Sequence, residues 1–160
     1  MIVADANLLI HYVCGTPLSN TAREVNQQDP DWVSPQLWRA EVLNGLLVMH
    51  RAGLMSLDRA VLAYRNAAAV ASDPLREENP DAILATAQKA GLTAYDATYV
   101  ALARSLGVPL VTEDKQILRA CPDVARSMRQ FLAPPERPMA VRERPATYKA
   151  RRTGRMKVEG

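Results

Sequence analysis

The chain has 160 residues, 48% of them hydrophobic and 23% charged, which is about one domain's length with enough apolar side chains for a single core. Its only cysteines are Cys14 and Cys121 and its only histidines are His11 and His50, which excludes a zinc site of thiolates and imidazoles and favours a reducing, cytoplasmic setting. No apolar run reaches the roughly 18 residues of a membrane span, so we expect no membrane partner.

Short β-like runs alternate with segments of helical apolar periodicity along most of the chain. This alternation is typical of βαβ units, in which helices cover both faces of a parallel sheet. We therefore predict an α/β protein with three layers, α/β/α, and a parallel sheet of four to five strands. The predicted strands lie near residues 2–5, 31–34, 75–78, 108–111 and 124–129. The predicted helices lie near residues 7–13, 18–28, 36–52, 57–72, 80–90, 95–106 and 114–120.

The charge pattern divides the chain into two parts. Residues 1–132 contain 12 Lys and Arg against 14 Asp and Glu, whereas residues 133–160 contain eight against three, together with four prolines. A basic segment with few apolar residues and several prolines gains too little burial to offset the entropy of ordering it. We therefore predict one domain over 1–132 and a basic, proline-containing tail over 133–160.

Four acidic residues lie where a carboxylate is unexpected. Asp5 interrupts the apolar stretch IVADANLLI just after the first predicted strand, and Asp114 follows the strand at 108–111. Glu41 and Asp96 lie within helices that are otherwise mostly apolar. The carboxyl ends of parallel strands and the amino ends of the following helices meet at one edge of a sheet, where ligands bind. We therefore expect the three aspartates to converge at this edge, with Glu41 reaching in from its helix.

A structural role is the alternative for each aspartate. Asp96 and Asp114 fit helix N-caps, a role worth about 1 kcal/mol, and Asp5 fits a cap for the helix that starts at Asn7. Glu41 does not fit this alternative, because we expect it in mid-helix, where no backbone amide is free to donate. Burying an unpaired carboxylate is costly, and converging carboxylates repel one another unless a cation lies between them. With only oxygen ligands available, Mg²⁺ or Mn²⁺ is the cation that fits best.

Four stretches of the sequence carry a resemblance to a known family. They read VADAN, PQLWRAEVLNGL, GLTAYDATYVALA and GVPLVTEDKQIL. Their order and spacing over residues 1–132 resemble those of the PIN-domain nucleases, specifically the VapC-type toxins of bacterial toxin–antitoxin pairs, and imply a PIN-like fold. By this resemblance the catalytic and metal-binding residues are Asp5, Glu41, Asp96 and Asp114. Two residues stand where the family often has a supporting polar side chain, namely Asn7 and Thr112.

The resemblance also implies a function. It implies an endoribonuclease that uses Mg²⁺ or Mn²⁺ to activate a water for hydrolysis of single-stranded or looped RNA, leaving a 5′-phosphate and a 3′-hydroxyl. The implied partners are the RNA substrate, a small cognate antitoxin protein and a second copy of the chain in a homodimer. Residues 35–72 resemble the helical pair through which family members dimerise and meet the antitoxin. The tail at 133–160 lies outside the resemblance and is either a solvated extension or an arm for the RNA backbone.

Two other functions fit parts of the same pattern. The D-A-N at Asp5 to Asn7 is similar to the D-x-D of haloacid-dehalogenase-like phosphatases, although Asn7 would remove that family's general acid. Such a phosphatase forms an acyl-phosphate on Asp5, whereas the nuclease forms no covalent intermediate. The other alternative is a catalytically idle PIN module that only binds RNA or a partner, and the presence of all four carboxylates argues against it.

Overall fold

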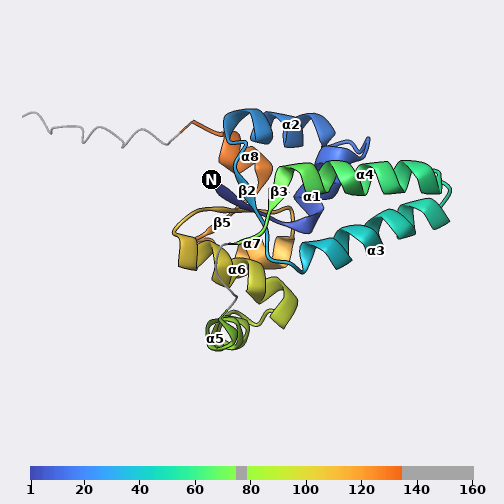
Figure 1. The fold of residues 1–160 in the computed structure, drawn as a ribbon. Coiled ribbons are helices and arrows are strands. Elements are labelled where there is room, and N and C mark those ends of the chain that lie inside the picture. The colour runs from blue at the N-terminus through green and yellow to red at the C-terminus, as the bar shows by residue number, and fades with distance from the viewer. Residues whose placement is uncertain (75–78, 135–160) are drawn as a thin grey trace, which may run out of the picture.

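The computed structural model describes residues 1–74 and 79–134, and Figure 1 labels their helices and strands. The strands are β1 (Ile2–Ala4), β2 (Trp32–Val33), β3 (Ala71–Ser72), β4 (Leu110–Val111) and β5 (Ala125–Arg126). The helices are α1 (Ala6–Val13), α2 (Ser19–Gln28), α3 (Trp38–Arg51), α4 (Leu57–Val70), α5 (Pro80–Ala90), α6 (Ala94–Leu106), α7 (Lys115–Ala120) and α8 (Met128–Leu132).

The five strands form one parallel sheet in the order β3-β2-β1-β4-β5, with β1 at its centre. Val3 of β1 is aligned with Val33 on one side and with Leu110 on the other. All three residues of β1 are fully buried, because a central parallel strand is covered on both faces. The predicted α/β class with a parallel sheet of four to five strands is confirmed.

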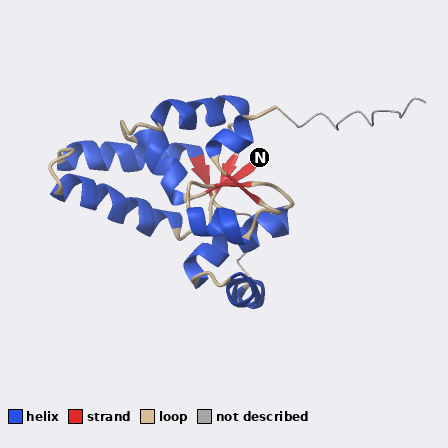
Figure 2. Cartoon of the chain, turned by 180° about the vertical axis from the view of Figure 1, so that it is seen from behind, coloured by secondary structure: helices blue, strands red, loops and turns tan. Residues whose placement is uncertain are grey.

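Helices cover both faces of this sheet, as Figures 1 and 2 show. On one side lie α2 and α8, which pack against each other, and on the other lies α6 with α5 outside it. The helices α3 and α4 pack against each other and against α1, and their far ends project beyond the sheet as a hairpin. None of the described helices combines the length and the apolar character needed to cross a bilayer.

The edge strand β3 lies at a different place from the one predicted. It consists of Ala71 and Ser72, which we predicted as the end of a helix, while the predicted strand at 75–78 falls outside the described residues. The helix α4 ends at Val70, and the Ser72 hydroxyl donates to the carbonyl oxygen of Trp32 in β2 at 2.9 Å. This strand has no β-branched or aromatic residue, so its composition gives no strand signal.

The predicted strand at 124–129 is mostly wrong. Only Ala125 and Arg126 form β5, and the chain then turns into α8 at Ser127. The Ser127 hydroxyl accepts from the amide of Gln130 at 3.2 Å, and the Gln130 side chain accepts from the amide of Ser127 at 2.8 Å. This is a capping box, and its Ser-x-x-Gln spacing is visible in the sequence.

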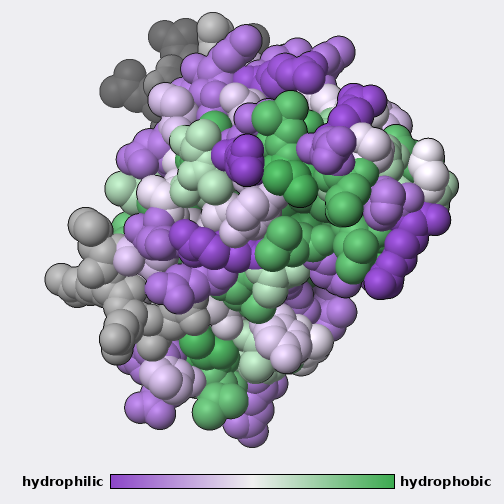
Figure 3. Space-filling view, turned by 45° about the vertical axis from the view of Figure 1, so that its right-hand side comes forward, coloured by the Kyte–Doolittle hydropathy of each residue, from purple (hydrophilic) through white to green (hydrophobic). Residues whose placement is uncertain are grey.

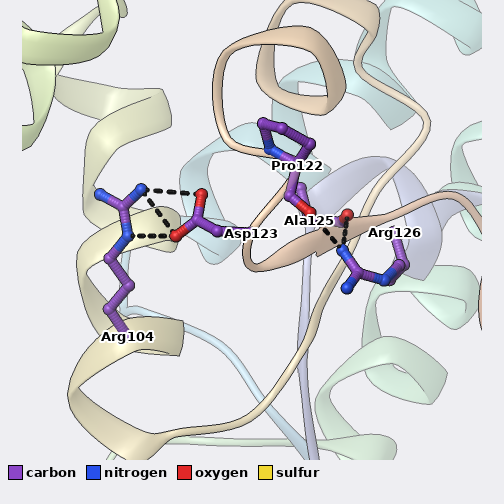
Figure 4. A network of polar contacts seen from close by, with 5 residues as sticks. All are labelled: Arg104, Pro122, Asp123, Ala125 and Arg126. Atoms are coloured by element: carbon purple, nitrogen blue, oxygen red, sulfur yellow. Dashed lines mark hydrogen bonds and ion pairs between the residues drawn. The ribbon is translucent and has the colours of Figure 1, made fainter.

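The amino edge of the sheet, where β4 and β5 begin, is held by one ion pair and by an arginine that binds backbone carbonyls. Arg104 of α6 donates from Nε and Nη2 to the carboxylate of Asp123 at 3.0–3.1 Å (Figure 4). Arg126 of β5 donates from Nη1 to the carbonyl oxygens of Pro122 and Ala125, at 2.7 Å each. These contacts fasten the turn before β5 to α6 and to the sheet.

Candidate active site

The carboxyl edge of the sheet brings Asp5 and Asp114 together. Asp5 follows β1 directly, and Thr112 leads from β4 to Asp114. The two strands are neighbours, with Ala4 aligned to Val111, so their ends open onto the same region. This pairing accounts for the proximity of Asp5 and Asp114, since neighbouring parallel strands end at the same edge. Asp96, the third aspartate of the expected group, lies in the first turn of α6 and not at a strand end.

A small polar network fixes the side chain of Asp5. The Thr112 hydroxyl donates to Asp5 Oδ2 at 2.5 Å and accepts from the Asp114 amide at 2.9 Å. Asn7 Nδ2 donates to Asp5 Oδ2 at 2.6 Å and to the Thr112 hydroxyl at 3.1 Å, while Asn7 Oδ1 accepts from the amide of Glu113 at 3.2 Å. Asn7 and Thr112 therefore orient Asp5 and tie it to the loop that carries Asp114.

Glu41 lies in the first turn of α3, which begins at Trp38, so the predicted mid-helix position is wrong. Its half-buried side chain accepts a hydrogen bond at Oε2 from the hydroxyl of Tyr99 in α6, and Tyr99 is 1% exposed. Burial, the bond to Glu41 and the charge of Asp5 raise the pKa of Tyr99, which keeps its hydroxyl a donor.

The sequence analysis missed the hydrogen bond between Tyr99 and Glu41. It follows Asp96 by three residues, and side chains with that spacing share one face of a helix. The sequence therefore places Tyr99 on the face of α6 that carries Asp96, but it does not reveal that Glu41 lies opposite.

The N-cap alternatives are correct for only one of the three aspartates. Asp114 caps α7, accepting at Oδ1 from the amides of Gln116 and Ile117 at 2.7 and 2.9 Å. The N-cap of α6 is Thr93, whose hydroxyl accepts from the Asp96 amide at 3.1 Å and donates to Asp96 Oδ2 at 2.7 Å. Asp5 occupies the N-cap position of α1, but its side chain makes no cap hydrogen bond.

The four carboxylates share a pattern of hydrogen bonding. In each of them one oxygen accepts from donors of the protein, while the other accepts no hydrogen bond of ordinary geometry from the described residues. The bonded oxygens are Asp5 Oδ2, Glu41 Oε2, Asp96 Oδ2 and Asp114 Oδ1. The second oxygen of each side chain is thus available to a ligand or to water.

The electrostatics of the site indicate mutual repulsion. Burial raises the pKa of Asp5 to about 6, against the hydrogen bond from Thr112, and the charges of Glu41 and Asp114 raise it further. Burial also raises the pKa of Glu41, which the Tyr99 bond lowers and the charge of Asp96 raises. The ion pairs of the described residues all lie elsewhere, so within residues 1–74 and 79–134 no Lys, Arg or terminal amine pairs with these carboxylates.

The donor set fits a hard divalent cation, because it consists of oxygens with uncompensated negative charge. Within residues 1–74 and 79–134, however, no three His, Cys, Asp or Glu side chains are grouped as they would be around a metal ion. Water would therefore supply much of the coordination, which is usual for Mg²⁺. An open hollow of about 370 Å³ at the amino edge, beside Arg104 and Arg126, is lined by none of the four carboxylates.

The chain is an α/β protein with a parallel sheet in the order β3-β2-β1-β4-β5 and with Asp5 and Asp114 at the carboxyl edge of that sheet. The PIN domain family model matches residues 2–121, and the chain therefore belongs to the PIN-domain family, whose members are generally metal-dependent nucleases. The crystal structure of PAE2754 from Pyrobaculum aerophilum has a similar fold, with a TM-score of 0.65 over 80% of this chain and 90% of that chain, at 24% identity. No curated protein matched.

Proposed function

We propose that this PIN domain is a metal-dependent endoribonuclease and the toxin of a toxin–antitoxin pair. The nuclease proposal is supported by Asp5, Glu41, Asp96 and Asp114, each of which has one oxygen without a hydrogen-bond donor among the described residues. Within residues 1–74 and 79–134, none of the four forms an ion pair. The burial of Asp5 beside the charges of Glu41 and Asp114 costs the fold free energy. A divalent cation from solution removes that cost.

In this proposal Asp5 and Asp96 hold Mg²⁺ or Mn²⁺, and Glu41 and Asp114 support it directly or through water. When bound, the ion lowers the pKa of a coordinated water and neutralises charge on the scissile phosphate. Asn7 keeps the Asp5 carboxylate in place, since its amide donates to the oxygen that faces Thr112. No side chain is needed as a nucleophile.

The geometry around Asn7 also bears on the phosphatase alternative. A haloacid-dehalogenase-like enzyme needs a general acid at this position, whereas the Asn7 side chain donates to Asp5 and Thr112 and accepts from the amide of Glu113. Both hydrogens of its Nδ2 and one acceptor position of its Oδ1 are used for orientation. Together with membership of the PIN-domain family, this arrangement favours the nuclease.

A labelled RNA tests the nuclease proposal. We expect cleavage with Mn²⁺ that stops on addition of EDTA, and products with a 5′-phosphate that a 5′-phosphate-dependent exonuclease degrades. Asp96→Asn should reduce the rate at least a hundredfold, while Asp123→Asn, the same change at the amino edge, should leave it unaltered. Cleavage that persists in EDTA or in Asp96→Asn contradicts the proposal, and binding of RNA without cleavage favours the idle PIN module.

The partner proposal depends on an exposed apolar surface of the α3–α4 hairpin. Figure 3 shows hydrophobic side chains gathered on the side of the molecule from which this hairpin projects. Exposed large hydrophobic residues are unusual in such number on one hairpin, and they favour a protein partner. They are Leu43, Leu47, Val48, Leu54, Leu57, Val61 and Leu62. We propose that this surface holds a second copy of the chain and the antitoxin.

The toxin role is tested in growing cells. We expect expression of the chain in the cytoplasm to arrest growth, and co-expression of a small protein encoded beside it to restore growth. Asp5→Asn, which should lack activity, serves as the matched control and should not arrest growth. Normal growth with a soluble, active product would remove the toxin role and leave the nuclease proposal standing.

A further inference from the structure

We infer that Tyr99 is a positioning residue that fixes the Glu41 carboxylate at the carboxyl edge and so sets the affinity of the site for a divalent cation. The inference rests on the proposed function, because it gives Tyr99 a role in the same metal site. It starts from the hydrogen bond between the Tyr99 hydroxyl and Glu41 Oε2, which joins α6 to α3.

Tyr99 is well suited to fix another side chain. Its ring is 1% exposed and belongs to the buried core, so the position of the hydroxyl is determined by packing. It is one turn from Asp96 on the same helix. One face of α6 therefore presents a proposed ligand, Asp96, and the anchor of a second, Glu41.

Glu41 needs such an anchor because nothing else among the described residues holds its carboxylate. The backbone of α3 is fixed by the close approach of α3 to α1 at Gly45, where a Cβ atom would lie 2.5 Å from Ile10 Cδ1. That contact does not involve the Glu41 side chain, which is only half-buried, so rotation about its side-chain bonds would carry the carboxylate toward solvent. Repulsion from Asp96 and Asp5 favours such a rotation, and the bond from Tyr99 opposes it.

Holding a carboxylate in place has a measurable consequence for metal binding. Side chains that orient metal ligands by hydrogen bonds typically change metal affinity 10- to 100-fold when they are removed. A Tyr99 hydroxyl with a purely structural role would instead affect folding stability and leave affinity unchanged. These two outcomes separate positioning from packing.

The test compares Mn²⁺ affinity by titration calorimetry in wild-type protein, Tyr99→Phe and Tyr12→Phe. The Tyr12 hydroxyl also donates to a side chain, Asn26 Oδ1 at 3.3 Å, but it belongs to the α1–α2 contact and makes a matched control. We expect Tyr99→Phe to bind Mn²⁺ at least tenfold more weakly and Tyr12→Phe to bind within twofold of wild type. Equal affinity in Tyr99→Phe overturns the inference, even where its unfolding midpoint in EDTA falls.

A double-mutant cycle tests whether the effect passes through Glu41. In a Glu41→Gln background, Tyr99→Phe should change Mn²⁺ affinity less than twofold, and a further tenfold loss would contradict the inference. Glu41→Asp keeps Tyr99 and the charge but shortens the side chain, so it should also lose at least tenfold, and wild-type affinity there would contradict the inference as well. A wild-type protein that binds no Mn²⁺ at all refutes the proposed metal site itself, and the inference with it.

Discussion

The carboxylates at the two edges of the sheet have different partners. At the amino edge Asp123 is exposed and forms a two-pronged ion pair with Arg104 (Figure 4). At the carboxyl edge Asp5 is 7% exposed and lies near Glu41 and Asp114. Its side-chain partners among the described residues are the hydroxyl of Thr112 and the amide of Asn7. The amino edge is arranged for a stable fold, whereas the carboxyl edge keeps charges that the fold alone would be better without.

This difference indicates where binding free energy is to be gained. A carboxylate that already has an arginine partner offers little to a cation from solution. A buried carboxylate with repelling neighbours and a free oxygen offers much, because the ion relieves repulsion that the fold tolerates. Strain of this kind is typical of functional sites, where local stability is given up for binding or catalysis.

The largest expected effect comes from removing the charge of Asp5. Asp5→Asn keeps the shape of the side chain and an acceptor for Thr112, but it removes the proposed metal ligand at the centre of the site. We expect RNA cleavage to fall at least a hundredfold and Mn²⁺ binding to become undetectable by calorimetry. Cleavage within tenfold of wild type would show that the carboxyl edge does not depend on this charge.

The same substitution should stabilise the metal-free protein in a pH-dependent way. The folded pKa of Asp5 is about 6 against 3.8 for the unfolded chain, so between these values the folded state binds more protons and its stability falls as pH rises. Roughly 2.4 kcal/mol of stability is lost between pH 4 and pH 7, since one pKa unit is about 1.4 kcal/mol and Asp5 of the unfolded chain is already more than half ionised at pH 4. In urea unfolding with EDTA, the free energy of unfolding of Asp5→Asn should exceed that of wild type by up to this amount at pH 7. At pH 4 the two free energies should differ little. A stability difference between Asp5→Asn and wild type that does not change with pH would contradict the raised pKa of Asp5.

Thr112→Val should have a smaller effect, because it disturbs the orientation of Asp5 without removing a ligand. The substitution removes the donor to Asp5 and leaves the Asp114 amide without its partner at a fully buried position. We expect a loss of about 1–3 kcal/mol in the free energy of unfolding and roughly a tenfold slower cleavage.

Thr98→Val is the matched control for this prediction. Thr98 is also a buried threonine, but its hydroxyl donates to the Ala94 carbonyl within α6. Its replacement should leave the cleavage rate within about threefold of wild type. Equal losses of activity in the two variants would mean that Thr112 acts through the core and not through Asp5.

The sequence predicted the parts of the structure that follow from strand order and periodicity. The placement of Asp5 and Asp114 required only that their strands be parallel neighbours, whatever the loops do. The contact of Tyr99 with Glu41 could not be predicted, because it depends on how α3 and α6 approach each other across the edge of the sheet. Apolar periodicity shows which face of a helix is buried, but not which residue of another helix it meets.

Local signals were also present but were overruled or overlooked. The Thr-x-x-Asp spacing at Thr93 identifies the N-cap of α6, and the residue type of Asp96 alone led to the wrong cap alternative. The strands β2, β3, β4 and β5 have two residues each, so sheet pairing and not strand propensity determines where they lie. The boundary at 132 stays a prediction, since the family model ends at 121 and residues 135–160 fall outside the described ranges.

The smallest effect on stability and cleavage is expected for Asp123→Asn. It makes the same chemical change as Asp5→Asn, but at the amino edge. Breaking the pair with Arg104 should lower the free energy of unfolding by less than about 1 kcal/mol, because both side chains are exposed to solvent and to salt. Cleavage should not change. In urea unfolding at pH 7 with EDTA, the two Asp→Asn variants should therefore shift stability in opposite directions, with a gain at the carboxyl edge and a slight loss at the amino edge. Shifts of the same sign would mean that the Asp5 and Asp123 carboxylates affect folding stability in the same way. The proposal of a cation at Asp5 would then lose its electrostatic basis.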